Sequence, residues 1–314
     1  MDLDVAQVRA FVRTAEELHF GRAAGTLAIS QQALSKRIAR LESLLGTELF
    51  QRGSNGVCLT ESGRRFLPPA RQTVAAADAA VAAASGKEHP LRVDVWGHLY
   101  APMRTLARVA GRAGELALGH GRDLPSVTTA LLRGDIDAGF GRVHPPLPAG
   151  VAHRLIRLEP VDAVLSTDHP LAAEPALRPD QLRHSTLWTP GALDRLDFLH
   201  RFADRFGIQS TAMSVNLGLA HFLAEVAGEP RRFSLVPADV PLPEVPGLRS
   251  VPLVDPTPLY AWSLLWCTGN AHPRLNDLSA ACAAEAGRSR WLEYDPTRDW
   301  LPEPPTSDPG SGQE

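Results

Sequence analysis

Residues 31–45 constrain the fold more than any other part of the sequence. Apolar side chains recur there every three or four positions, which is the spacing of the buried stripe of an amphipathic helix. Ser30 directly precedes the run and is a favourable N-cap, while Gly46 follows it and stops the helical pattern. The pattern therefore predicts a helix with one buried side. The buried stripe consists of Leu34, Ile38, Leu41 and Leu45.

The segments on either side of this helix complete an informative order. An amphipathic helix is expected over 4–18 and a short alanine-rich helical segment over 22–28. Two extended runs, 48–52 and 57–60, flank an Asn-Gly pair whose positive backbone angles suit a tight hairpin turn. Helix, helix-turn-helix and hairpin is the order of a winged helix, which is a DNA-binding fold.

The segment 61–84 predicts one long helix. It is rich in alanine, and Thr60 precedes it as a candidate N-cap. A proline pair at 68–69 is expected to kink this helix, because proline removes one backbone hydrogen bond and crowds the preceding turn. Residues 85–90 have the composition of a linker.

Charge is distributed unevenly along the chain. The formal net charge of −3 argues against a protein whose whole surface binds nucleic acid. Between residues 30 and 71, however, seven basic side chains stand against three acidic ones. The predicted winged helix therefore carries a local basic footprint of the kind that nucleic-acid-binding domains use.

Past the linker, extended apolar runs alternate with amphipathic stretches. Such alternation is typical of α/β lobes with largely parallel sheets. Crossover strands between two lobes are expected near 158–164 and 255–268, with a ligand cleft between the lobes. Residues 296–314 are dense in Pro, Gly and Ser and are expected to be a disordered tail. The extended runs are 91–96, 115–118, 136–141, 161–166, 213–217, 233–236 and 259–267, and the amphipathic stretches are 99–112, 124–133, 193–206, 218–227 and 274–286.

The cysteines indicate a reducing compartment. Cys58, Cys267 and Cys282 show no CxxC spacing and are odd in number, which fits neither a disulfide framework nor a zinc site. The first residues lack the basic and apolar regions of a secretory signal, and no apolar run is long enough to cross a bilayer. We expect a cytoplasmic protein that binds no metal and does not contact a membrane.

Little in the sequence supports an enzyme. There is no Gly-x-Ser-x-Gly motif, and Gly139-Phe140-Gly141 lacks the third glycine of a dinucleotide fingerprint. We therefore expect no catalytic residue and no cofactor. A redox sensor that uses Cys267 or Cys282 is an alternative, but buried inert thiols are favoured because no neighbouring residue in the sequence would lower a thiol pKa.

Several runs resemble the LysR-type family of bacterial transcription factors. The N-terminal match is contiguous over about the first 65 residues and includes LAISQQALS at 27–35, IARLE at 38–42 and LTESG at 59–63. Weaker landmarks of the family's effector domain follow at 91–93, 131–137, 168–171 and 233–237. The resemblance implies a winged helix-turn-helix at 1–60, a linker and dimerisation helix at 61–90, and a two-lobed, periplasmic-binding-protein-like effector domain at 91–295.

The resemblance also implies which residues meet DNA. The helix over 31–45 would enter the major groove, because its apolar stripe is anchored and its opposite face is polar and basic. Glutamine can pair bidentately with adenine, and lysine favours guanine or phosphate. Gln32 stands where the family usually has a proline or a small residue. This difference affects which DNA sequence the protein would prefer, but not whether it binds DNA. The expected contacts are Ser30, Gln31, Gln32, Ser35, Lys36 and Arg40 on this helix, Arg52, Ser54 and Asn55 in the wing, and Arg64 and Arg65 in the long helix.

The expected effector pocket departs from the family's pattern. The first strand usually runs into Ser or Thr residues that hold a small anion at a helix start. Residues 96–100 read Trp-Gly-His-Leu-Tyr instead, which favours an aromatic-lined or vestigial pocket over a simple carboxylate site. The same residue types also serve as core packing or surface groups. The candidate effector-binding residues are Trp96, His98, Tyr100, Arg142, His144, Trp188 and Thr189.

These features favour a transcription regulator controlled by a small-molecule effector. Its expected partners are double-stranded DNA, a second copy of the chain and, for an activator, RNA polymerase. The small side chains of 61–84 permit close helix approach, so we expect a homodimer on an inverted repeat, with pairing into a tetramer left open. A two-lobed solute-binding module without DNA function is the alternative, while a molybdate-type regulator fits less well because it carries small barrel domains.

Overall fold

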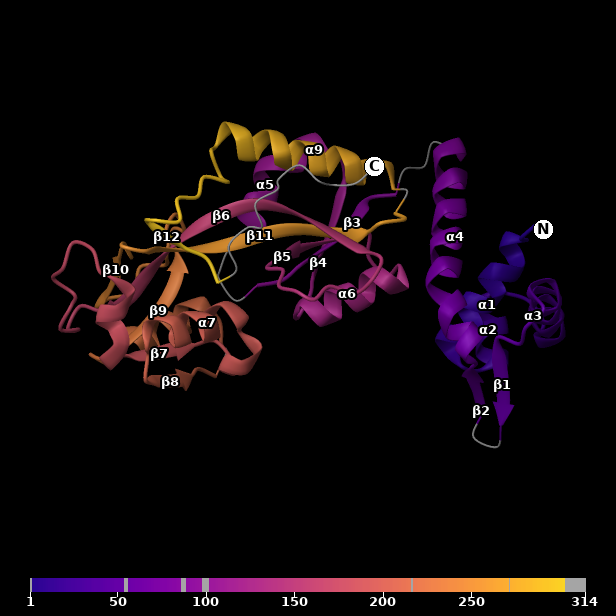
Figure 1. Ribbon diagram of the computed structural model, residues 1–314, viewed down its shortest axis with the longest axis horizontal. Helices are drawn as coiled ribbons and strands as arrows, with labels where there is room; N and C mark the ends of the chain where they lie inside the picture. Colours follow the sequence, from indigo (N-terminus) through magenta and orange to yellow (C-terminus); the bar gives the residue numbers. More distant parts are fainter. Residues whose placement is uncertain are drawn as a thin grey trace.

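The computed structural model describes residues 2–53, 56–85, 89–97, 102–215, 217–270 and 272–302. An N-terminal helical unit with a hairpin, one long helix and two lobes built on a shared ten-stranded mixed sheet follow one another along the chain (Figure 1). Within the described residues, no helix is both long and apolar enough to cross a membrane.

The N-terminal unit has the predicted order of elements. Helix α3 spans Gln31–Leu45, the range expected from its flanking residues. The Ser30 hydroxyl accepts a hydrogen bond from the Ala33 amide at 3.2 Å, and Gly46 takes the left-handed conformation with φ of 66°. The remaining elements are α1 (Val5–Glu17), α2 (Phe20–Thr26), β1 (Phe50–Gly53) and β2 (Gly56–Leu59).

Aromatic side chains hold this unit to the long helix. The Phe11 ring of α1 lies 5.3 Å from Phe50 on β1 and 5.1 Å from Phe66 on the long helix, measured between ring centroids. The same core contains the stripe of α3, in which Leu34 and Leu41 are fully buried. The helices, the hairpin and the start of the long helix therefore share one core.

The long helix α4 covers Glu61–Ser85 and continues through both of its prolines. Its start is capped as expected, because the Thr60 hydroxyl accepts a hydrogen bond from the Gly63 amide at 2.9 Å. A Cβ on Gly63 would lie 2.2 Å from the Leu49 carbonyl oxygen, so only glycine allows the helix to approach the hairpin this closely. The kink at Pro68 and Pro69 stays a prediction.

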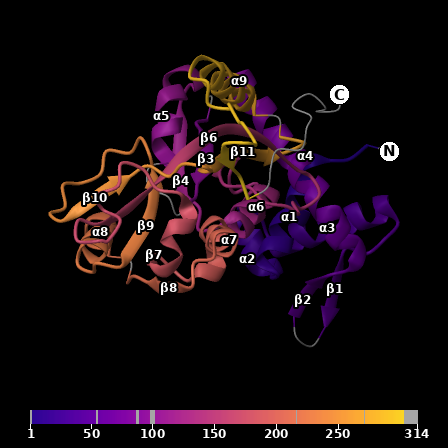
Figure 2. The ribbon, with the colours of Figure 1, turned by 60° about the vertical axis from the view of Figure 1, so that its left-hand side comes forward.

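The first lobe is a small parallel sheet covered by helices. Strand β3 pairs in parallel with both β4 and β5. Helices α5 and α9 lie side by side over one face of the sheet (Figure 2). The elements are β3 (Leu91–Val95), α5 (Pro102–Ala113), β4 (Leu116–His120), α6 (Leu124–Arg133), β5 (Ala138–Gly141) and α9 (Pro273–Arg288).

The second lobe is built around β7 and β9. Strand β7 pairs in parallel with both β8 and β9, and α8 packs on the sheet. Apolar residues of α7 and β9 belong to one core. Its elements are η1 (Pro179–His184), β7 (Thr186–Thr189), η2 (Leu193–Arg195), α7 (Asp197–Phe206), β8 (Ser210–Met213), α8 (Leu219–Ala227), β9 (Arg232–Pro237) and β10 (Leu248–Val251).

Two long strands connect the lobes, as expected. Strand β6 (Val151–Ser166) pairs with β11 (Thr257–Cys267) through its first part and with β9 and β10 through its second part. These pairings are antiparallel, and so is the pairing of β11 with β5. The expectation of largely parallel sheets is therefore wrong for the centre of the sheet, because strands that run between lobes return beside each other.

The strand expected over 213–217 is also wrong. Strand β8 ends at Met213, and the apolar residues that follow it are on the surface, with Val215 72% and Leu217 68% exposed. The apolar residues predicted a buried strand, but within a single chain Val215 and Leu217 do not pack into a core.

The predicted disordered tail begins too early. Strand β12 (Asp299–Trp300) pairs in parallel with Thr257 and Pro258 of β11. The Trp300 ring packs against phenylalanines of α7, with centroid distances of 5.7 Å to Phe198 and 5.1 Å to Phe206. The Pro-rich composition of the whole segment concealed this aromatic anchor. Residues 303–314 lie outside the described residues.

Candidate DNA interface and effector site

The polar side of α3 faces outward. Gln31, Gln32, Lys36 and Arg40 are exposed and Ser35 is half-buried. The opposite side is clamped into the core, so the helix presents amide, hydroxyl and cationic groups on a rigid support. Such groups are suited to base edges and phosphates.

The start of α2 lies next to the start of α3, which the sequence analysis did not consider. His19 caps α2, since its Nδ1 accepts hydrogen bonds from the Gly21 amide at 3.1 Å and the Arg22 amide at 3.3 Å. The Gln31 Oε1 atom lies 3.6 Å from the position a Cβ would take on Gly21. Histidine is not among the residues that usually cap helices, so this cap had no clear signal in the sequence.

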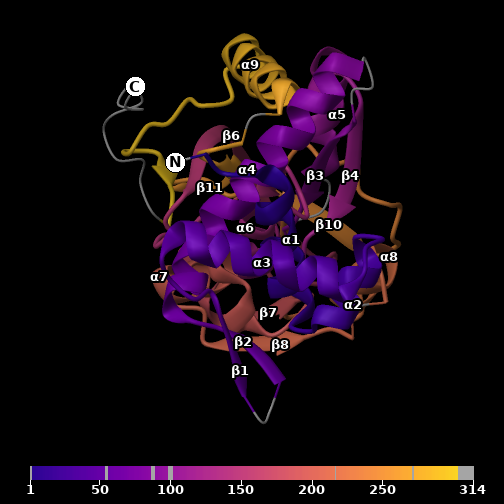
Figure 3. The same cartoon turned by 90° about the vertical axis from the view of Figure 1, so that its right-hand side faces the viewer.

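The hairpin projects away from the rest of the chain (Figure 3). Arg52 pairs with Val57 in its register, which places Arg52 in β1 near the turn. The expected contacts Ser54 and Asn55 lie outside the described residues. The thiol of Cys58 on β2 is exposed.

Both arginines expected at the start of α4 are exposed. Arg65 lies 4.0 Å from Glu61, with 74% and 82% of the respective side chains exposed. A pair this exposed contributes little to stability because water screens it. Arg64 and Arg65 are therefore accessible to an external phosphate.

Three of the candidate effector residues pack within their own lobes, Trp96 in the first lobe and Trp188 and Thr189 in the second. The indole of Trp96 is 6% exposed and contacts β5, because a Cβ on Gly141 would lie 2.3 Å from Trp96 Cδ2. Trp188 Nε1 donates to Glu225 at 3.3 Å, and the Thr189 hydroxyl donates to the Gly191 carbonyl at 2.7 Å. These contacts give the three residues packing roles. His98 and Tyr100 lie outside the described residues.

Arg142 instead bridges the two lobes. It directly follows β5 of the first lobe, and its Nη2 and Nε atoms lie 2.7 Å and 2.9 Å from the carboxylate of Asp197, the first residue of α7 in the second lobe. Burial opposes ionisation of Asp197, but hydrogen bonds from Arg201 and Arg142 outweigh it and lower the pKa of the carboxyl. His144 is half-buried and lies near enough that a proton on its ring would further favour the ionised form of Asp197.

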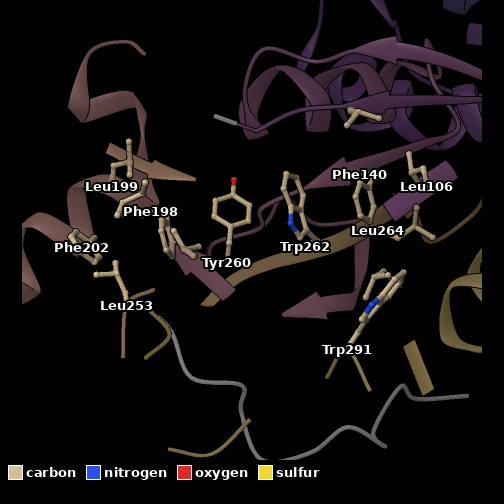
Figure 4. Close-up of a cluster of buried hydrophobic side chains, with 14 of the residues drawn as sticks. Leu106, Phe140, Phe198, Leu199, Phe202, Leu253, Tyr260, Trp262, Leu264 and Trp291 are labelled. Atoms are coloured by element: carbon tan, nitrogen blue, oxygen red, sulfur yellow. The ribbon is translucent and has the colours of Figure 1, made fainter. Parts of the chain in front are cut away.

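A row of aromatic rings lies beside this ion pair (Figure 4). Phe140 of the first lobe stacks on Trp262 of β11 at 5.5 Å, and Trp262 lies 4.6 Å from Tyr260. Tyr260 in turn lies 5.0 Å from Phe198 of the second lobe. We call these four residues, with Arg142 and Asp197, the interlobe junction. The sequence predicted only that Tyr260 and Trp262 lie in an extended run, at 259–267.

A buried polar cluster lies behind the row. Trp262 Nε1 donates to Glu159 at 2.6 Å, and Arg157 lies 3.1 Å from Glu159 and 2.7 Å from Asp239. Burial raises the pKa of Glu159 to about 7 in spite of the neighbouring Arg157. Arg104 of α5 also pairs with Asp239, at 2.6 Å. The cluster links the first lobe, β6 and the segment after β9.

The buried cysteines have the properties of inert thiols. Burial raises the pKa of Cys267, and it raises the pKa of Cys282 to about 12. Both thiols hold their protons at neutral pH, which disfavours the redox-sensor alternative. Within the described residues, no group of three or more His, Cys, Asp or Glu side chains is arranged to hold a metal ion.

A winged helix with an outward-facing polar helix, joined through a long helix to two lobes on crossover strands, defines a DNA-binding protein with a ligand-binding-type domain. Residues 5–64 match the family model "Bacterial regulatory helix-turn-helix protein, lysR family". Residues 120–287 match "LysR substrate binding domain". The chain belongs to the LysR family of transcriptional regulators, which are not enzymes.

Individual relatives agree with this assignment. The chain is 31% identical over 303 residues to the HTH-type transcriptional regulator IlvR of Caulobacter vibrioides, covering 88% of this chain and 96% of that protein. It is 35% identical over 191 residues to the uncharacterized HTH-type regulator YnfL of Escherichia coli, covering 56% of this chain and 61% of that protein. A full-length OxyR variant from Pseudomonas aeruginosa has the same fold, with a TM-score of 0.66 at 23% identity over 90% of this chain and 95% of that one.

Proposed function

We propose that this protein is a sequence-specific DNA-binding transcriptional regulator of the cytoplasm. The observation that carries the proposal is the α3 helix, whose apolar stripe is buried while its glutamines, lysine and arginine are exposed. In this proposal residues 1–60 read DNA, 61–90 join two copies, and 91–295 form the regulatory domain.

The DNA contacts divide into two kinds. Gln31, Gln32 and Ser35 reach base edges in the major groove, and Lys36 contacts guanine or an adjacent phosphate. Phosphate contacts from α3 and its cap, the long helix and the wing fix the register but carry no sequence information. These further contacts come from Ser30, Arg40, Arg52, Ser54, Asn55, Arg64 and Arg65.

Two copies bind an inverted repeat. A homodimer formed through α4 places two α3 helices on successive major grooves, because the symmetry of the dimer is mirrored in the half-sites. Further pairing into a tetramer and contact with RNA polymerase belong to the same proposal. Regulation by a small-molecule effector would act by changing the arrangement of lobes and dimers.

Fluorescence anisotropy on the DNA upstream of the protein's own gene tests this function. We expect Gln32→Ala to remain folded and to weaken specific binding by about 1–3 kcal/mol, because a base contact is lost. The matched control is Arg183→Ala, which removes an exposed cation from η1 in the second lobe. Absence of sequence-specific binding by wild type would favour the solute-binding module without DNA function. Specific binding that Gln32→Ala leaves unchanged would remove Gln32 from the base contacts.

A further inference from the structure

The junction between the lobes is filled by the protein's own side chains. Trp262 and Tyr260 project from β11 and are 0% and 1% exposed, which makes them the two largest fully buried side chains among the described residues. They belong to a single core that contains Phe140 of the first lobe and Phe198 of the second. The lobes are therefore packed on each other through β11.

The backbone of the first lobe is shaped to admit the indole. Gly97 follows β3 with φ of 154°, and a Cβ at this position would lie 2.8 Å from Trp262 Cη2. A side chain here would collide with the ring. The backbone just after the first strand therefore lies directly against the Trp262 ring.

The charged groups at the junction also satisfy each other. The Arg142 side chain is 6% exposed, and two of its nitrogens contact one oxygen of Asp197. Its guanidinium carbon lies 5.9 Å from the centre of the Phe198 ring. The second oxygen of Asp197 accepts from Arg201 Nε at 2.8 Å. The carboxylate of Asp197 in the second lobe therefore pairs with the guanidinium of Arg142 in the first lobe.

We propose that Asp197 is a built-in anionic ligand, which occupies Arg142 and holds the two lobes together without a small carboxylate from solution. The inference rests on the proposed regulatory role of this domain and specifies its regulation. A carboxylate is the natural partner of a buried guanidinium, and one supplied by the same chain has an effective concentration that a free anion at low concentration cannot match. The wild-type effector domain is accordingly closed to small carboxylates at Arg142.

Chemical rescue of Asp197→Ala in the full-length protein tests this inference, with sodium acetate as the probe. We expect Asp197→Ala to lower the melting temperature by about 5–10 °C, because Arg142 then stays buried without its partner. Acetate should raise the melting temperature of this variant saturably above that in sodium chloride of equal ionic strength. Wild type should respond equally to the two salts.

The matched control is Asp204→Ala, which removes another carboxylate of α7 that is 71% exposed. It should show neither the loss nor the rescue. If Asp197→Ala does not fold, Asp197→Ser replaces it in the same comparison, because its smaller side chain still leaves room for acetate beside Arg142.

Saturable stabilisation of wild type by acetate, or a folded Asp197 variant that acetate stabilises no more than chloride, would overturn the inference. The readout needs no DNA, so its failure is separate from failure of the DNA-binding function. If wild type binds DNA but is saturably stabilised by acetate, the built-in ligand hypothesis is rejected and the DNA-binding function stands.

Discussion

Helix α3 and the interlobe junction differ in how their charged side chains are partnered. Lys36 and Arg40 on α3 are exposed, and among the described side chains neither forms an ion pair. Arg142 at the junction is buried, and its guanidinium is held by the carboxylate of Asp197 from the same chain. A surface that meets an external partner leaves its donors available, whereas a junction that holds two lobes together satisfies them internally.

The largest expected effect concerns the filled junction. Trp262→Ala should destabilise the protein by about 3–5 kcal/mol, because it removes a large buried ring and leaves a cavity between the lobes. Urea unfolding measures the change, and indole should restore part of it by occupying the cavity. Leu118→Ala is the control, since Leu118 is 43% exposed on β4. A variant as stable as wild type would mean that the junction is not a packed core.

A smaller effect should appear as a pH dependence of stability. The pKa of Glu159 is about 7 in the folded protein against 4.5 when unfolded, so the folded state holds this proton more tightly. Its contribution is fully present below pH 4.5 and is lost as pH rises to about 7, a fall of about 3 kcal/mol.

Glu159→Gln isolates this contribution. The amide keeps an oxygen that can accept from Trp262 and does not titrate, while Arg157 retains Asp239 as a partner. Urea unfolding of wild type and variant between pH 5 and pH 8 should show a shallower fall for the variant. Parallel curves would contradict the assignment of this proton to Glu159.

The smallest effect on stability is expected at the DNA-facing surface. Arg65→Ala should change the free energy of unfolding by less than about 0.5 kcal/mol, because its pair with Glu61 is exposed. The same variant should lower the salt dependence of DNA binding by about one phosphate contact. Titrations at several salt concentrations measure this slope. If the salt dependence of DNA binding is unchanged, Arg65 does not contact a phosphate. The contrast between the DNA-facing surface and the interlobe junction would then be weaker.

Local sequence patterns were sufficient for the DNA-binding unit. The α3 helix has the predicted bounds because Ser30 and Gly46 act within one turn of its ends, and the stripe of α3 repeats with the helical period. The exposure of Gln32 and Lys36 followed from the same periodicity. Such features depend on neighbours that are close in sequence.

The interlobe junction could not be derived in this way. Arg142 was a candidate, but its partner Asp197 is 55 residues away, and no spacing rule connects them. Trp96 and Trp262 are both aromatic residues at strands, yet one packs inside the first lobe and the other between the lobes. Which aromatic residue fills which space depends on how distant strands pair, and a single sequence does not contain that information.

The contact at Gly63 has a mechanical consequence. With no room for even a methyl group between the long helix and the Leu49 carbonyl, the hairpin cannot pivot independently at this point. A rotation of α4 about its own axis would therefore carry the Leu49 backbone and the start of β1 with it, so that helix and strand move as one rigid part.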